Sequence, residues 1–122
     1  MRGEAGAGGR AVSLFPGEQV RDRLVANHVR EGRVYEGFLF VTTQRLAFAP
    51  WPAAEKRGAR PFVIPYTEVS GVDVAPRGTG WRDGSRRHRL QVTRSSGDAE
   101  LFVVTRPEKA VDLIERARCG AP

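Results

Sequence analysis

The sequence predicts a mainly β fold, a barrel or sandwich of about seven antiparallel strands with one C-terminal α-helix. Short apolar segments alternate with polar residues at the two-residue period of a strand, and clusters of Gly, Pro, Ser and Asp separate them. Only the last segment of the chain changes to helical spacing. Such strands can curl into a barrel or into two packed sheets, and a terminal helix can plug the open end.

The chain of 122 residues is long enough for one domain with a single modest core. Residues 1–13 are rich in Gly and Ala and show no periodicity, so they cannot bury enough apolar surface to offset the entropy cost of ordering. We therefore predict a disordered tail over 1–13, a folded domain over 14–119 and a short tail over 120–122.

The strands follow one another with short turns between them. They are predicted at residues 20–30, 34–42, 45–49, 62–66, 69–75, 89–94 and 101–104. The second half of 34–42 is apolar on both faces, as expected for a strand covered on both sides. Pro65 assigns its strand to an edge or a bulge, because proline cannot donate to a neighbouring strand. Residues 50–60 and 77–85 are predicted to be loops.

The C-terminal segment is predicted to be an amphipathic helix. Its apolar stripe consists of Ala110, Leu113, Ile114 and Ala117. Thr105 and Glu108 are three residues apart, which fits a capping box at the start, and Gly120 is expected to end the helix.

Three motifs give the chain a family resemblance. Residues 14–18, LFPGE, resemble the L-x-x-G-E opening of GRAM-type and bacterial pleckstrin-homology-like domains. Residues 37–48, GFLFVTTQRLAF, resemble their G-x-L-x-x-T-x-x-R-L-x-F hairpin, and residues 64–72, IPYTEVSGV, look like their I-P-x-x-x-I-x-x-V segment. The likeness extends over about residues 14–118. It implies a pleckstrin-homology-like fold of seven strands and one helix, and a non-catalytic module that binds lipid headgroups or proteins without a cofactor.

Within these motifs the residues themselves indicate structural roles. Gly37 permits a close backbone approach or a kink in a curved strand. Thr42 can bond to local backbone groups at the turn. Arg45 is expected to lay its stem over the sheet and keep its head group in water.

The strongest functional signal is positive charge. The net charge is +6, and Arg supplies nearly all of the cations, a bias that with abundant Ala and Gly is typical of a high-GC bacterial genome. A glycine-rich basic loop carries the candidate anion- or lipid-binding residues Arg77, Trp81, Arg82, Arg86, Arg87 and Arg89. Guanidinium groups match phosphate oxygens, and Trp can seat at a membrane interface. A solvated loop that merely reflects composition is the alternative interpretation.

A second basic loop contains Lys56, Arg57 and Arg60, and the sequence alone does not say whether the two loops converge. The first hairpin carries Arg30 and Arg33 but not the full basic pattern of inositide-binding pleckstrin-homology domains. Specific inositide recognition is therefore not expected.

Enzymatic and metal chemistry are not predicted. The sequence contains no Gly-x-Ser-x-Gly nucleophile elbow, and its acidic residues fall on separate strands. His28, His88 and Cys119 are too few for a clustered metal site, so no metal and no cofactor are expected.

The expected partner is a protein or an anionic membrane surface. The high pI of about 10.6 also permits nucleic acid, which we keep as the alternative of a nucleic-acid-binding β-barrel. It is less expected, because no helix carries basic residues at groove-reading spacing and no aromatic pair lies on an evident stacking strand. An exposed edge strand such as the one containing Pro65 could recruit a second copy. The absence of a transmembrane segment and of a secretory signal, with a single cysteine, favours the cytoplasm, with a peripheral position at the inner membrane face as an alternative.

Overall fold

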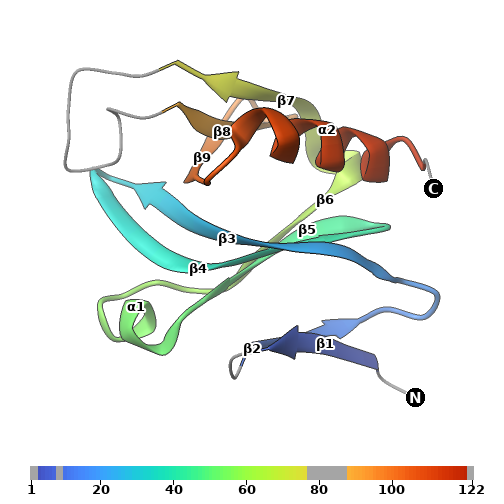
Figure 1. The fold of residues 1–122 in the computed structure, drawn as a ribbon, viewed down its shortest axis with the longest axis horizontal. Coiled ribbons are helices and arrows are strands. Elements are labelled where there is room, and N and C mark those ends of the chain that lie inside the picture. Colours follow the sequence, from blue (N-terminus) through green and yellow to red (C-terminus); the bar gives the residue numbers. More distant parts are fainter. Residues whose placement is uncertain (1–2, 8–9, 77–87, 121–122) are drawn as a thin grey trace.

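The computed structural model describes residues 3–7, 10–76 and 88–120 (Figure 1). The strands are β1 (Gly3–Ala7), β2 (Arg10–Leu14), β3 (Val20–Arg30), β4 (Arg33–Thr42), β5 (Arg45–Pro50), β6 (Phe62–Pro65), β7 (Val69–Ala75), β8 (Arg89–Arg94) and β9 (Ala99–Val103). The helices are α1 (Pro52–Lys56), the single 3-10 turn η1 (Tyr66–Glu68) and α2 (Pro107–Arg118). In the part of the chain described, no helix is long and apolar enough to cross a bilayer.

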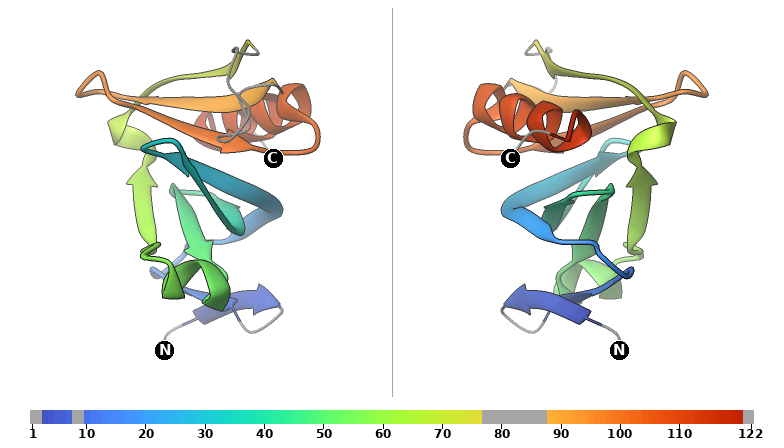
Figure 2. Two further views of the ribbon diagram at one scale, coloured as in Figure 1. Left: turned by 90° about the vertical axis from the view of Figure 1, so that its left-hand side faces the viewer. Right: turned by 90° about the vertical axis from the view of Figure 1, so that its right-hand side faces the viewer.

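Seven strands form one antiparallel sheet in the order β6-β5-β4-β3-β9-β8-β7. The first and last strands of this order do not pair, so the sheet bends into two layers without closing into a barrel. Figures 1 and 2 show β7, β8, β9 and α2 above a layer of β3 to β6, with the pair β1-β2 at the opposite end. The predicted mainly β fold with a C-terminal helix is confirmed, and Pro65 lies in an edge strand as predicted.

The main core lies between the two layers and α2. Its fully buried side chains include Leu39, Phe48, Ile64, Phe102 and Ile114. A second apolar cluster covers the opposite face of β4 and β5. It consists of Phe38, Phe40, Ala47 and Ala49, with Leu14, Val20 and Trp51 packed against them. This confirms that the second half of β4 is covered on both sides.

Helix α2 packs on β7, β8 and β4 through its predicted apolar stripe, in which Ala110, Ile114 and Ala117 are buried. The predicted capping box is wrong. The helix begins at Pro107, its N-cap is Arg106, and no side chain caps it. Proline is well suited to the first helical position, and its place leaves Thr105 one residue too early to be the cap.

Two segments differ from the sequence-based expectation. Residues 3–7 and 10–14, which but for Leu14 lie within the predicted disordered tail over 1–13, form the antiparallel pair β1-β2. Strand pairing uses backbone groups that Gly and Ala also possess, which composition does not reveal. The predicted loop over 50–60 contains α1, because Pro52 at the first helical position, followed by two alanines, favours a short helix.

Candidate functional site

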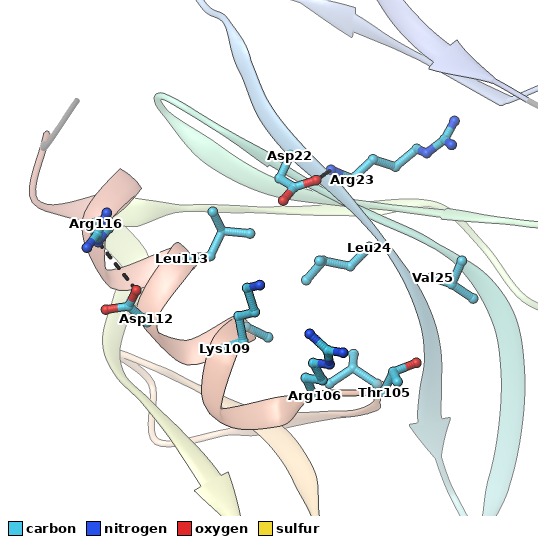
Figure 3. Close-up of a pocket in the computed structure, with 12 residues that line it drawn as sticks. Asp22, Arg23, Leu24, Val25, Thr105, Arg106, Lys109, Asp112, Leu113 and Arg116 are labelled. Atoms are coloured by element: carbon cyan, nitrogen blue, oxygen red, sulfur yellow. Dashed lines mark hydrogen bonds and ion pairs between the residues drawn. The ribbon is translucent and has the colours of Figure 1, made fainter.

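A groove of about 570 Å³ lies between the first half of β3 and helix α2 (Figure 3). Its residues are Asp22, Arg23, Leu24, Val25, Val104, Thr105, Arg106, Lys109, Ala110, Asp112, Leu113 and Arg116. Leu24 and Leu113 point toward one another across the groove, and the head groups of Arg106 and Lys109 lie between strand and helix. The groove therefore has an apolar floor with cations on its helical side.

One wall of the groove is an unpaired strand edge. β3 pairs with β4 from Val20 to Arg30, with an irregularity in register between Val20 and Asp22, but on the other side β9 pairs only with Asn27, His28 and Val29. β9 then leads away through Val104 toward α2, so that residues 20–26 have no strand on the side opposite β4 in the described part of the chain. A free edge of this kind presents unpaired N–H and C=O groups to a potential partner.

The register identifies which groups face the open side. Glu31 and Gly32 form a two-residue turn with positive φ angles of 51° and 74°, so Arg30 and Arg33 flank it as a hydrogen-bonded pair. Between Asp22 and Arg30, hydrogen bonding alternates along the antiparallel strand, which directs the backbone of the even-numbered residues toward β4 and that of Arg23 toward the groove side. The N–H of Arg23 indeed donates to Asp22 Oδ1 at 2.7 Å and not to a strand.

The charges of the groove are only partly paired. On α2, Arg116 Nε lies 3.3 Å from Asp112 Oδ2, an exposed i,i+4 ion pair. The guanidinium of Arg23 extends away from the groove and stacks 4.4 Å from the ring centroid of Phe38. Arg106 and Lys109 have no acidic partner among the described residues, so the groove presents two free cations beside its apolar floor.

The structure tests little of the predicted basic loop. Arg77, Trp81, Arg82, Arg86 and Arg87 lie outside the described residues. Arg89 is half-buried on β8, where its Nη2 donates to the carbonyl of Pro76 at 3.4 Å. Arg89 therefore takes part in the strand end that leads into this loop, and its binding role stays a prediction.

The three cations of the second basic loop have different surroundings. Arg57 forms an ion pair with Glu36, donates to the carbonyl of Val34 at 3.3 Å and lies 5.4 Å from the Tyr35 ring centroid. These contacts hold the end of α1 against β4, so Arg57 has a structural role. The third member, Arg60, donates to the carbonyl of Ala59 at 3.1 Å.

The exposed Lys56 completes this loop. Helix α1, on which it lies, is at the far end of the molecule from α2 in Figure 1. This loop is therefore separate from the groove.

A buried ion pair joins the first two sequence motifs, and the sequence did not reveal it. Arg45 Nε donates to Glu18 Oε2 at 2.9 Å, and Thr42 Oγ1 donates to the same oxygen at 2.6 Å. Glu18 Oε1 accepts from the N–H of Phe15 at 2.8 Å and from Arg45 Nη2 at 3.1 Å, and Nη2 also reaches the carbonyl of Ser13 at 2.6 Å. Each oxygen of the carboxylate therefore accepts two hydrogen bonds.

The expectation that the head group of Arg45 stays in water is therefore wrong, because Arg45 is only 7% exposed. Burial raises the pKa of Glu18, but the hydrogen bonds from Arg45, Thr42 and Phe15 outweigh it, so the pKa lies below its ordinary value. The role predicted for Thr42 is confirmed, since its Oγ1 accepts from the N–H of Arg45 at 3.0 Å. This network joins the segment before β3 to β5.

His28 is buried and does not face the groove. Its Nε2 lies 2.8 Å from Glu100 Oε1, and its ring packs among Phe48, Phe62 and Phe102 with centroid separations of 4.8 to 5.5 Å. Burial lowers its pKa, and the neighbouring Glu100 only partly counters this. Within the described ranges no three His, Cys, Asp or Glu side chains gather as metal ligands would.

The arrangement of strands and helix has counterparts among solved structures. The C-terminal domain of an unknown protein from Leishmania infantum is similar with a TM-score of 0.66 and 18% identity, over 85% of this chain and 87% of that chain. The Vps36 N-terminal PH domain is similar with a TM-score of 0.59 and 15% identity, over 93% of this chain and 90% of that chain. No family model and no curated protein matches the sequence.

Both similarities extend over most of each chain. They show that this protein has a pleckstrin-homology-like fold, as the resemblance of its motifs implied. At these identities the likeness concerns the fold alone, and the function must be argued from the site.

Proposed function

We propose that this protein is a non-catalytic binding module that docks a segment of a protein partner in the groove between β3 and α2. The supporting observation combines three features of one groove: the apolar pair Leu24 and Leu113, a strand edge, and the cations Arg106 and Lys109. Among the described residues, neither the edge has a neighbouring strand nor the cations an acidic partner. Binding sites are commonly concave and apolar with a few polar groups that orient the ligand.

The proposed class is the GRAM-type branch of the pleckstrin-homology-like proteins, acting in the cytoplasm. The three motifs support this branch, and the first two have a structural reason in the fold. A Cβ at Gly37 would lie 2.6 Å from the Ala49 carbonyl oxygen, and Glu18, Thr42 and Arg45 of the first two motifs form one network.

The second candidate partner is an anionic lipid surface at the inner face of the membrane. It is favoured by the arginine-rich segment that precedes β8, with Arg77, Arg82, Arg86, Arg87 and the neighbouring Trp81, and by Arg89 at the start of β8. Lipid binding of this kind would not need the groove. The two candidates can therefore be separated by experiment.

Selection from a library of random dodecapeptides displayed on phage tests the leading candidate. We expect recovered peptides that bind the immobilised protein saturably and compete with one another. Failure to recover any such peptide contradicts a peptide-docking module. Flotation with phosphatidylcholine vesicles, with and without phosphatidylglycerol, tests the second candidate, and equal recovery on both at low and physiological salt excludes it. A mobility shift with DNA or RNA at low salt would support the nucleic-acid alternative.

A further inference from the structure

We propose that the groove binds its partner by strand addition. An extended, acidic segment of another protein, with apolar residues at alternate positions, pairs with the free edge of β3 and continues the line of β9. This inference rests on the proposed function and specifies the conformation and chemistry of the partner. Strand addition supplies affinity through main-chain hydrogen bonds and specificity through alternate side chains.

The length of the free edge suits a short linear segment. Strand β9 does not pair with residues 20–26. Seven residues at about 3.3 Å each span roughly 23 Å. Arg23 and Val25 turn their backbone groups toward this side, as the alternation of hydrogen bonds from the turn at Glu31 requires. The N–H of Arg23 donates to the exposed carboxylate of Asp22 on its own strand, and a partner carbonyl could replace that acceptor.

The two faces of the groove set the side-chain pattern. Residues of an added strand that face α2 would lie between Leu24 and Leu113, where an apolar side chain is buried. Residues that face the opposite way would lie beside Val25, which is 56% exposed, and Arg23. An apolar residue at every second position therefore fits the groove.

Charge favours an acidic partner and disfavours a second copy of this chain. Arg106 and Lys109 stand on the helical wall without acidic partners in the described ranges, and Arg23 flanks the outer face. If β3 of a second copy paired at the same edge, Arg21 and Arg23 of one molecule would face those of the other. Like charges across a strand pair are destabilising, whereas Glu or Asp of a partner would approach these cations.

The dodecapeptides recovered by display, synthesised with a fluorescein label, are the probes. We expect them to share acidic residues alternating with apolar ones. In fluorescence anisotropy titrations, Arg106→Glu with Lys109→Glu should raise the dissociation constant at least tenfold. Arg30→Glu with Arg33→Glu is the matched control, because it changes the net charge equally at the exposed hairpin end of β3 and should leave the affinity within about twofold.

A second pair of variants tests the backbone contact. Arg23→Pro removes the N–H on the groove side, whereas Arg23→Ala removes only the side chain, so the proline variant should bind at least fivefold more weakly than the alanine variant. Hydrogen exchange of the amides of residues 23 and 25 should also slow when the wild-type protein is saturated with peptide. The exchange measurement keeps the test valid if the proline variant fails to fold.

The outcomes separate this inference from the proposed function. Peptides that bind the Arg106→Glu, Lys109→Glu variant as tightly as the wild type, or that leave amide exchange in β3 unchanged, overturn strand addition while a binding module remains. Binding to phosphatidylglycerol vesicles that this variant abolishes, with peptide affinity unchanged, assigns the groove to a membrane and overturns the inference. A display selection that yields nothing removes both proposals.

Discussion

Arg45 and Lys109 both lie next to apolar side chains, yet their surroundings are opposite. Arg45 is buried, and its guanidinium is joined to Glu18 and the carbonyl of Ser13 by three hydrogen bonds. Lys109 stands at the rim of the groove, and no carboxylate among the described residues is bonded to it. A basic residue in this protein can therefore stabilise the fold or remain available to a ligand. Which of these roles it has depends on whether an acidic partner lies beside it.

The largest expected effect is at the buried pair. Arg45→Met leaves the Glu18 carboxylate buried without its cation, and breaking a buried ion pair costs roughly 3–5 kcal/mol. Urea denaturation measures this loss in the free energy of unfolding. The double variant Arg45→Met with Glu18→Gln should recover part of the loss, since no buried charge is then uncompensated. A single variant as stable as the wild type would contradict the structural role of the pair.

Next in size is Gly37→Ala in β4. Its Cβ would lie 2.6 Å from the Ala49 carbonyl oxygen and 2.8 Å from the Phe48 ring, so the strand and the core must shift. Overpacking of this kind costs roughly 1–3 kcal/mol. Gly71→Ala is the control, because its nearest neighbour would be at 3.7 Å, an ordinary contact. Thermal unfolding should give a lower midpoint for the first variant only, and equal midpoints would argue against the close approach at Gly37.

A smaller effect is expected from pH. Burial lowers the pKa of His28 below its ordinary value of 6.5, so the unfolded chain binds more protons at mildly acidic pH. The stability contributed by neutral His28 is fully present above pH 6.5 and is lost as pH falls below it. Thermal midpoints measured between pH 7.5 and pH 5 should therefore decline, and His28→Gln should flatten the decline. His88→Gln, at an exposed site, is the matched control, and an equal flattening by both substitutions would contradict the assignment to His28.

The smallest effect on stability is expected at the groove. Lys109→Met removes a cation that has no ion-pair partner in the described structure, and such surface changes usually alter the free energy of unfolding by less than about 0.5 kcal/mol. The affinity of the Lys109→Met variant for the displayed peptides should nevertheless be lower than that of the wild type. A large loss in the free energy of unfolding, measured by urea denaturation, would mean that Lys109 has a structural role like that of Arg45, and would contradict the contrast between the two regions.

Local patterns in the sequence were sufficient where neighbouring residues decide the structure. The alternation in β8, the short turn between β3 and β4, and the stripe of α2 all depend on contacts within a few residues, and each lies where it was predicted. Gly37 was also interpreted correctly, because a glycine within an apolar strand suggests a close approach. The capping box failed because the proline at position 107, not the Thr-Glu spacing, set the start of the helix.

The candidate site was harder to predict, because its parts are distant in the chain. The basic loop was predicted as a binding site from its composition. The groove depends on where β9 separates from β3, which no local pattern reveals. The ion pair between Glu18 and Arg45 spans 27 positions, and each residue by itself resembles an ordinary exposed charge.

The sequence by itself determined the class of fold, because strand and helix periods record which side of each segment is buried. It also determined the positive charge of the protein. Only the tertiary structure decided which charges are paired and which strand edge stays open. Those outcomes depend on distances between segments that meet only when the layers pack, and a charge that gains a buried partner differs physically from one that remains at the rim of a groove.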